Sequence, residues 1–472
     1  MRPLATAAVV GALSIVGCAS HDGVRARFAV PPQAAAAARA SEPPPPPAAK
    51  EADSTVADEP APAACAPVDD ALLEPPACND AISSVPVPPI VDPTGSLAHF
   101  HERLIGLARG TVKDRVHIAL FGDSNAQADM MTGHLRRVLQ GRLGDGGHGF
   151  VVLGRPRGWY GHQDVRRGGT WRAFQNIQVS NDLVADGHYG FANIASETSS
   201  WGARAWVGTA KEGPVGTSVS RFDVFYFRRP NGGSFDVLAD GVLVKTIATR
   251  ADAFEAAVEE VQVPDGPHEL TCVSRGRGAV RFSGVALERE QPGVVVDALG
   301  TGAMNIGQMT WVKSSTRRPM LERRAYDLVI VHLGTAQSVL SLHKALAKQV
   351  IDELRAALPN ASLLFLTPPD ALLNRFGPGS DPRIVTVSRQ IREIASENGV
   401  AFWDYRAAMG GDASMATFLR KHLAWTDAIH LYNKGHQMMG DRLLRALLED
   451  NARFRREHPD AGCGAGGVTP EK

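Results

Sequence analysis

The chain has 472 residues, which excludes a small stapled mini-protein and allows two folded units plus tails, because domains average about 150 residues. Lysine plus arginine and aspartate plus glutamate number 50 each, so the formal net charge is zero. This balance excludes the globally basic surface that neutralises phosphates, and we expect no nucleic-acid partner. The 47 glycines and 31 prolines predict many turns, β-structure or long linkers.

Residues 1–17 have the character of an export signal. A positively charged start is followed by an apolar run at 4–14 that is too short to span a membrane. Residues 15–18, Ile-Val-Gly-Cys, resemble the bacterial lipobox, whose cysteine becomes the lipidated first residue of the mature chain. We therefore expect a lipoprotein signal peptide at 1–17 and a lipid anchor on Cys18 that attaches the protein to a membrane.

The residues that follow predict where the anchor places the protein. Ala19 follows Cys18 directly. In Gram-negative lipoproteins an aspartate at this position tends to retain the protein at the inner membrane. Because this chain has alanine there, the resemblance implies an outer-membrane lipoprotein facing the periplasm. Residues 18–95 are rich in alanine and proline, including five consecutive prolines at 43–47, and predict a disordered linker. At the other end, the polar, glycine-rich residues 451–472 predict a flexible tail.

Four cysteines remain once Cys18 is assigned to the lipid. Cys65 and Cys78 are close enough in sequence to close a small loop in an oxidising compartment. The pairing of Cys272 and Cys463 does not follow from the sequence. The chain has no Cys-x-x-Cys motif, and zinc or iron–sulfur ligation has no support.

Repeated strand–helix units indicate an α/β domain. The apolar strand 116–121 is followed by a tight Gly-Asp-Ser-Asn turn and a helical pattern over 131–143. Further units follow with strands at 328–333, 362–366 and 400–404 and helices at 339–358, 384–398 and 434–448. Between them, residues 154–290 alternate as short strands separated by Asn-Gly, Asp-Gly and Gly-Pro turns. We predict an α/β domain with a parallel sheet, split into 96–153 and 291–450, with a β-sandwich inserted at 154–290.

Two segments of the α/β domain carry residues suited to nucleophilic catalysis. Ser124 follows the first strand and precedes a helix N-terminus, where backbone N–H groups stabilise a developing oxyanion. Asp427 and His430 lie three residues apart just before the last helix. This gap lets one loop present a histidine base together with the carboxylate that fixes its tautomer.

In these two segments the sequence resembles the SGNH/GDSL hydrolases, and it is similar in particular to bacterial peptidoglycan O-acetylesterases with an inserted carbohydrate-binding-like β module. The resemblance covers roughly residues 96–450 and implies a three-layer αβα, flavodoxin-like domain interrupted by that module. It rests on the segments 122–129, 132–136, 144–150, 402–404, 408–411 and 427–430.

The resemblance also implies roles for individual residues. Ser124 would be the nucleophile, His430 the general base and Asp427 the carboxylate that orients His430. The oxyanion hole would comprise the N–H group of Ser124, the N–H group of Gly300 in the second block, and an asparagine in the third block.

The third block departs from the family pattern. The family has Gly-x-Asn after the strand, and this chain has Gly334-Thr335-Ala336-Gln337. The loss of one oxyanion donor costs about 2.7–4 kcal/mol, a factor on the order of 10²–10³ in turnover. Gln337 or Asn305 remain as alternative donors. A separate alternative is that the protein binds glycans without hydrolysing them.

Aromatic residues of the inserted module are candidates for stacking on sugar rings, although aromatic residues in a β module are more often part of the core. The candidates for glycan contact are Trp159, Tyr160, Trp171 and Trp201. The module also has an arginine-rich patch around residues 155–172 that fits either a solvated face or the carboxylates of a cell-wall peptide. The 15 histidines show no metal-ligand spacing.

The resemblance implies a serine esterase that removes O-acetyl groups from peptidoglycan or another cell-envelope glycan, with no metal or organic cofactor. We expect it to act as a monomer. Two alternatives stay open: a non-catalytic glycan-binding lipoprotein, and an O-acyltransferase on the same scaffold that passes the acyl group to a sugar hydroxyl instead of water.

Overall fold

A computed structural model describes residues 65–78, 80–156, 160–176, 184–336, 344–373 and 379–463. Three residues with predicted roles, Cys18, Trp159 and Gln337, lie outside these ranges. Among the described helices, none is both long enough and apolar enough to cross a bilayer.

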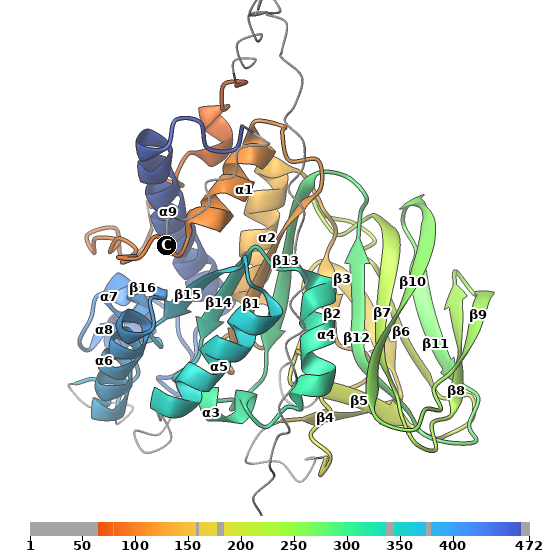
Figure 1. The fold of residues 1–472 in the computed structure, drawn as a ribbon. Helices are drawn as coiled ribbons and strands as arrows, with labels where there is room; N and C mark the ends of the chain where they lie inside the picture. Colours follow the sequence, from red (N-terminus) through yellow and green to blue (C-terminus); the bar gives the residue numbers. More distant parts are fainter. Residues whose placement is uncertain are drawn as a thin grey trace, which may run out of the picture. The chain divides into compact units, whose positions relative to one another are not determined.

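The α/β part is built on a five-stranded parallel sheet in the order β13-β1-β14-β15-β16 (Figure 1). Its strands are β1 (Arg115–Gly122), β13 (Gly293–Gly300), β14 (Leu328–His332), β15 (Ser362–Leu366) and β16 (Ala401–Trp403). Alternate residues of β1 enter different cores: Ile118 and Leu120 pack in one cluster, and Ala119 and Phe121 in the other. The sheet is therefore buried on both faces, as a parallel sheet requires.

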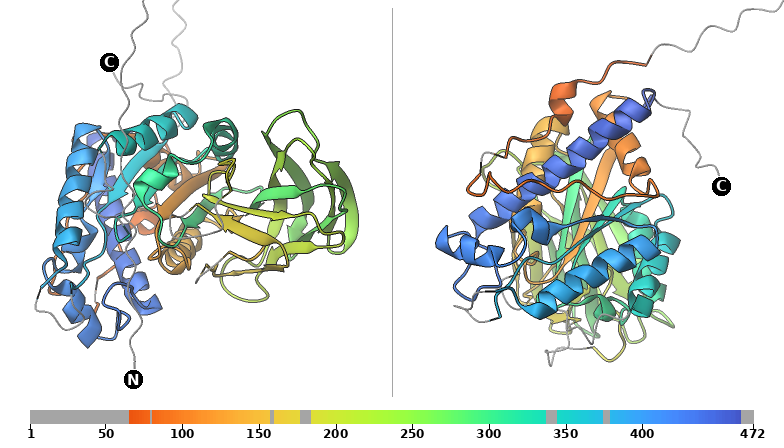
Figure 2. Two further views of the ribbon diagram at one scale, coloured as in Figure 1. Left: turned by 90° about the horizontal axis from the view of Figure 1, so that it is seen from below. Right: turned by 90° about the vertical axis from the view of Figure 1, so that its left-hand side faces the viewer.

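Helices cover both faces of the parallel sheet (Figures 1 and 2). One face packs against α1 (Ala98–Ala108), α2 (Met130–Leu143) and α9 (Asn433–Glu457), together with α7 (Tyr405–Met409) and α8 (Ser414–Arg420). The other face packs against α3 (Ile306–Met309), α4 (Ser314–Arg324), α5 (Lys344–Ala357) and α6 (Pro382–Glu397). This arrangement confirms the predicted three-layer αβα fold.

The segment between β1 and β13 forms two antiparallel sheets that pack as a sandwich. The six-stranded sheet has the order β10-β7-β12-β5-β4, with β2 paired to β12: β2 (Gly149–Val151), β4 (Arg172–Gln175), β5 (Ile194–Thr198), β7 (Val219–Arg228), β10 (Glu255–Gly266) and β12 (Val280–Glu288). The five-stranded sheet has the order β3-β6-β11-β8-β9: β3 (Val165–Gly169), β6 (Arg204–Thr209), β8 (Ser234–Ala239), β9 (Val242–Ala248) and β11 (Glu269–Ser274). These sheets fit the predicted inserted β module.

The six-stranded sheet is buried on both faces. Along β7, Phe222 and Val224 point into the sandwich core. The alternate residues Phe225 and Phe227 share a second core with Leu299 of β13 and the helices α3 to α6. The inserted module and the α/β domain therefore share a hydrophobic core, which couples their packing.

The described residues of the predicted linker, 65–78 and 80–95, contact the α/β domain. They include the short 3₁₀ helix η1 (Asp70–Leu73). Val91 forms a two-bond bridge with Phe402, which lies in β16, and Asp80 pairs with the buried guanidinium of Arg442 at 2.7 and 3.0 Å. A fully buried arginine needs such a partner, and Asp80 supplies it from 362 residues earlier in the chain.

The pairing of the disulfide differs from the predicted one. Cys65 bonds to Cys463, and Cys78 and Cys272 are free, so the predicted loop between Cys65 and Cys78 is wrong. Cys272 is fully buried in the sandwich core, where it has no cysteine partner. The last helix, α9, extends to Glu457 rather than ending near residue 448, because residues such as Asn451 pack inward and bond to His101 of α1 at 3.1 Å.

Candidate active site

Ser124 lies in the loop 123–129, which joins β1 to α2; we call it the nucleophile loop. The loop packs tightly against the end of β13. A Cβ added to Gly300 would lie 2.4 Å from the backbone carbon of Ala126, closer than real Cβ contacts allow. Glycine at position 300 therefore lets the neighbouring strand approach the nucleophile loop at backbone distance.

Ser124, His430 and Asp427 form a continuous hydrogen-bonded series. The Ser124 Oγ lies 2.7 Å from His430 Nε2, and His430 Nδ1 lies 2.7 Å from Asp427 Oδ2. Because an ionised carboxylate can only accept, the Nδ1 atom carries the proton, and Nε2 is left to accept the serine proton. The sequence placed all three residues in one site, and the structure brings them together.

The Asp427 carboxylate is held in position by its own turn. Its Oδ1 accepts the backbone N–H groups of Ile429 at 2.9 Å and His430 at 3.1 Å. Partial burial would raise the pKa of Asp427, but the hydrogen bonds from the His430 ring and from these two N–H groups hold it below its usual value. The carboxylate is therefore ionised at neutral pH and fixes both the orientation and the tautomer of His430.

Asp123 joins the nucleophile loop to the third block. This buried carboxylate accepts the N–H groups of Asn125 at 3.1 Å, Gly334 at 3.2 Å and Thr335 at 2.9 Å. Burial raises the pKa of Asp123, and the N–H donors act against that shift. Sequence reasoning treated Asp123 only as part of a motif and missed this connecting role.

The residues predicted for the oxyanion hole lie in different surroundings. Gly300 is paired in register with Gly122 at the carboxyl ends of β13 and β1. Ala336 lies exposed on the third-block loop and offers a methyl group where the family has an amide. Asn305 is engaged elsewhere: its side chain caps α3 in a reciprocal capping box with Gln308.

Two further histidines lie buried behind the candidate site, and sequence reasoning did not assign them a place. His332 ends β14 and packs on the Tyr405 ring at 4.6 Å. Burial lowers the pKa of His332 to about 3, and burial together with nearby His430 lowers the pKa of His436 to about 4. Both rings are therefore neutral at physiological pH, so neither adds a positive charge behind His430.

A cavity of about 410 Å³ opens beside the turn that carries Asp427. Its lining mixes apolar with polar and charged residues: Thr335, Ala336, Ala371, Leu372, Leu373, Asp381, Arg383, Ile384, Asp427 and Ile429. A second cavity, of about 680 Å³, lies at the opposite, amino ends of the strands, where Arg103 and Arg115 pair with Asp327 and Glu288. Of these two cavities, the smaller one adjoins the Ser124 end of the sheet.

The structure places the candidate glycan contacts in different surroundings. Trp171 is fully buried and packs on Phe282 at 4.4 Å, so its interpretation as a sugar contact is wrong. The Arg167 guanidinium lies 5.0 Å from the Tyr160 ring centroid and covers one face of that ring. Trp201 is 83% exposed and keeps its candidacy. Near the turn that carries Asp427, the sequence analysis missed Trp425, whose ring is partly exposed and packs on Tyr432 at 4.5 Å with a tilt of 39°.

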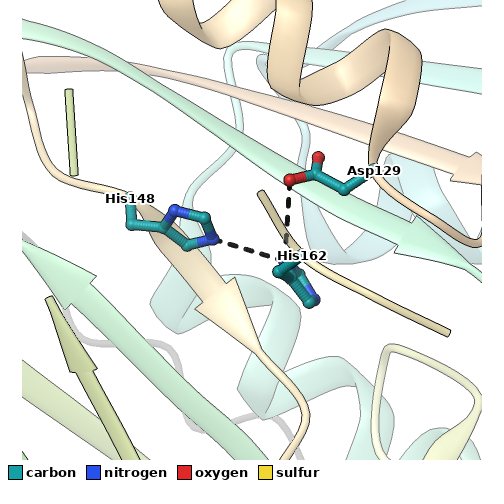
Figure 3. A group of neighbouring side chains, drawn as sticks. All are labelled: Asp129, His148 and His162. Atoms are coloured by element: carbon teal, nitrogen blue, oxygen red, sulfur yellow. Dashed lines mark hydrogen bonds and ion pairs between the residues drawn. The ribbon is translucent and has the colours of Figure 1, made fainter. Parts of the chain in front are cut away.

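One group of described side chains has the spacing of a metal site: Asp129, His148 and His162 (Figure 3). The charges around it do not fit a cation. Both Asp129 oxygens accept from the buried Arg136 guanidinium, at 2.9 and 3.0 Å, and this positive charge would repel a metal ion. The group is therefore a buried hydrogen-bonded cluster rather than a metal site.

A serine hydroxyl, an imidazole and a carboxylate in series, at the carboxyl ends of a parallel sheet, have the arrangement of a serine acylhydrolase site. Comparison with known families agrees: residues 265–438 match the GDSL-like Lipase/Acylhydrolase family, a range that includes Asp427 and His430 and begins after Ser124. The chain therefore carries a GDSL-like lipase/acylhydrolase domain, which supports an esterase.

Among solved structures, a peptidoglycan O-acetylesterase matches with a TM-score of 0.65 and 23% identity, over 77% of this chain and 99% of the other. This likeness shows a shared fold, including the inserted module. Two further matches are too weak to support a conclusion. They are a family two carbohydrate esterase from Clostridium thermocellum (TM-score 0.25, 11% identity, over 61% of this chain and 98% of the other) and the salicylyl-acyltransferase SsfX3 (TM-score 0.23, 14% identity, over 60% of this chain and 93% of the other). No curated protein sequence matches the chain.

Proposed function

We propose that the protein is a serine esterase that removes O-acetyl groups from peptidoglycan or another cell-envelope glycan. The observation that carries the proposal is the series Ser124–His430–Asp427, with both contacts at 2.7 Å. The fold shared with a peptidoglycan O-acetylesterase supports the choice of an acetylated glycan as substrate.

The reaction proceeds through an acetyl-enzyme. Ser124 Oγ attacks the acetyl carbonyl carbon while its proton passes to His430 Nε2, and Asp427 stabilises the imidazolium that forms. The tetrahedral intermediate expels the sugar oxygen, which takes the proton back from His430. Water, deprotonated by His430, then attacks the acetyl group, and acetate leaves as the Ser124 hydroxyl is restored.

The N–H groups of Ser124 and Gly300 stabilise the oxyanion in this scheme, and the third donor is absent at Ala336. One missing donor costs about 2.7–4 kcal/mol, so we expect a slow esterase rather than an inactive one. The same substitution is the specific observation that favours a second candidate, a glycan-binding protein without turnover.

Acetate release from O-acetylated cell walls, measured for the wild type and for Ser124→Ala, tests the proposal. The expected result is release by the wild type and none above background by the variant. Equal release by both proteins would exclude the mechanism. A wild type that binds cell walls but hydrolyses neither them nor a small chromogenic acetyl ester would favour the binding protein, and acetyl transfer to an added sugar would identify a transferase.

In this proposal the chain is exported, lipidated on Cys18 and held at the outer membrane facing the periplasm. The lipobox-like residues 15–18 and Ala19 support this location. Labelling with a radioactive or clickable fatty acid is expected for the wild type and lost in Cys18→Ala, and that variant should move from the membrane fraction to the soluble fraction. Unchanged labelling of the variant would contradict the anchor.

A further inference from the structure

The cluster of Figure 3 joins the inserted module to the nucleophile loop. Asp129 is the last residue of that loop and precedes α2 with a φ of 56°, a left-handed conformation that non-glycine residues adopt only when their surroundings enforce it. Its side chain is fully buried and makes no capping bond to α2. Instead both oxygens accept from the guanidinium of Arg136, about two turns further along in α2. Arg136 in turn donates to the Val296 carbonyl of β13.

The contacts from the other side come from residues 160–164, a segment of the inserted module that leads into β3. The Gly161 N–H donates to the Gln127 carbonyl at 3.3 Å, and the Gln163 N–H donates to Asp129 Oδ2 at 2.9 Å. Between them, His162 Nδ1 lies 4.0 Å from the same Asp129 oxygen. Three consecutive residues of the module therefore follow the outer side of the nucleophile loop.

The hydrogen bonds favour one tautomer of His162. The Val152 N–H donates to the Tyr160 hydroxyl oxygen at 3.3 Å, so the Tyr160 O–H is free to donate to His162 Nε2 at 2.7 Å. The proton of the neutral ring then sits on Nδ1 and faces both the Asp129 carboxylate and His148 Nε2, the latter at 3.3 Å (Figure 3). Burial lowers the pKa of His162 to about 3, so the ring keeps this neutral form.

The nucleophile loop is thus held at both ends. Asp123 fixes its start to the third block, and Asp129 fixes its end to Arg136 and Gln163, with the His162 ring packed 4.0 Å from the same carboxylate. Ser124 lies between these two anchors, and its Oγ must stay at hydrogen-bond distance from His430. A displacement of about 1 Å at a reacting group costs on the order of 10²-fold in rate.

We propose that His162 is a positioning residue for Ser124, through which the inserted module, and not only the α/β domain, sets the geometry of the nucleophile loop. The module is then part of the catalytic apparatus even for a small ester that makes no contact with a glycan-binding surface. This inference rests on the proposed role of Ser124 as the nucleophile.

His162→Phe in the full chain tests the proposal, because it keeps a ring of similar size and removes both nitrogens. For a small chromogenic acetyl ester we expect kcat to fall about tenfold, with KM unchanged. His162→Asn is the conservative variant, because its amide can replace Nδ1 as a polar donor beside His148 and Asp129, and it should recover most of kcat. The rate at which a fluorophosphonate labels Ser124 should follow the same order and does not require turnover.

The matched control is His101→Phe. His101 is also a buried histidine paired with a carboxylate, Asp450, at 2.8 Å, but it lies between α1 and α9, away from the nucleophile loop. All proteins are compared at a temperature at which circular dichroism shows them folded. The expected result is a lower Tm for both phenylalanine variants and a loss of kcat and labelling for His162→Phe alone.

The outcomes separate the two proposals. If His162→Phe retains kcat and labelling within twofold of the wild type, or His101→Phe loses as much, His162 has only a structural role and the inference is overturned. A wild type that neither hydrolyses the ester nor is labelled on Ser124 overturns the proposed function and the inference together.

Discussion

Replacement of Asp427 by asparagine removes one charge from the site and leaves its shape. The asparagine oxygen still accepts the backbone N–H groups of Ile429 and His430, which hold the side chain at 2.9 and 3.1 Å in the wild type. The amide NH₂ group then faces His430 Nδ1 and can only donate to it. The imidazole must switch its proton to Nε2, where it blocks acceptance of the serine proton.

The expected cost follows from the contact distance and the exposure. Two unit charges 2.7 Å apart attract by about 1.5 kcal/mol in bulk water and about 6 kcal/mol at an effective dielectric constant of 20. The side chains of His430 and Asp427 are 22% and 40% exposed, so solvent screens the pair substantially. We expect a loss of about 2–4 kcal/mol in transition-state stabilisation, which is about 30- to 1,000-fold in kcat.

The chain supplies a control with nearly the same geometry. His134 Nε2 lies 2.7 Å from Asp441 Oδ1, and their side chains are 19% and 38% exposed, but neither residue contacts Ser124. The assay is kcat for a small chromogenic acetyl ester, with Asp427→Asn and Asp441→Asn measured beside the wild type. A kcat for Asp427→Asn within threefold of the wild type, or an equal loss in Asp441→Asn, would refute the role of Asp427 as the orienting carboxylate.

Three further outcomes are expected. Ala336→Asn should raise esterase turnover by restoring a third oxyanion donor; an unchanged or lower kcat would mean that another group already fills this position. Replacing both Cys65 and Cys463 by serine should lower the free energy of unfolding by about 2–5 kcal/mol, because the disulfide closes a loop of nearly the whole domain, whereas Cys78→Ser should not; equal urea midpoints for the double variant and the wild type would contradict the pairing. Unfolded histidines have a pKa near 6.5, but burial lowers the pKa of His162 and His332 to about 3 and that of His436 to about 4, so the unfolded chain binds more protons between these values. Stability should therefore fall as the pH falls from about 6.5 towards 4, and urea midpoints that stay flat over this range would contradict the buried, neutral rings.

The parts of the fold that follow from local pattern were predictable from the sequence. The strand predicted at 362–366 has the bounds of β15, and the strand predicted at 116–121 lies within β1. A short apolar run after a helix is itself the signal for a buried parallel strand. The segments 122–124 and 427–430 likewise carry local motifs, so Ser124, Asp427 and His430 could be named before their geometry was known.

Contacts between distant segments could not be predicted in this way. The Cys65–Cys463 bond and the Asp80–Arg442 pair join residues more than 360 positions apart, and neither partner carries a local signal of the other. Trp171 illustrates a different limit. The residue immediately precedes β4, whose exposed and buried positions alternate, and composition alone does not reveal which face a given aromatic side chain occupies. The sequence therefore predicted a sugar contact where the fold places a core residue.

In the third block, the position of the loop does not depend on the side chain at position 336. The loop that carries Ala336 is held by the Asp123 carboxylate, which binds the N–H groups of Gly334 and Thr335. These bonds use the backbone, so they do not depend on which side chain follows at position 336. Loss of the family asparagine therefore removes a donor without removing the loop from the site. For this reason Ala336→Asn changes the oxyanion chemistry alone, and its effect on kcat measures how much this esterase lacks in that donor.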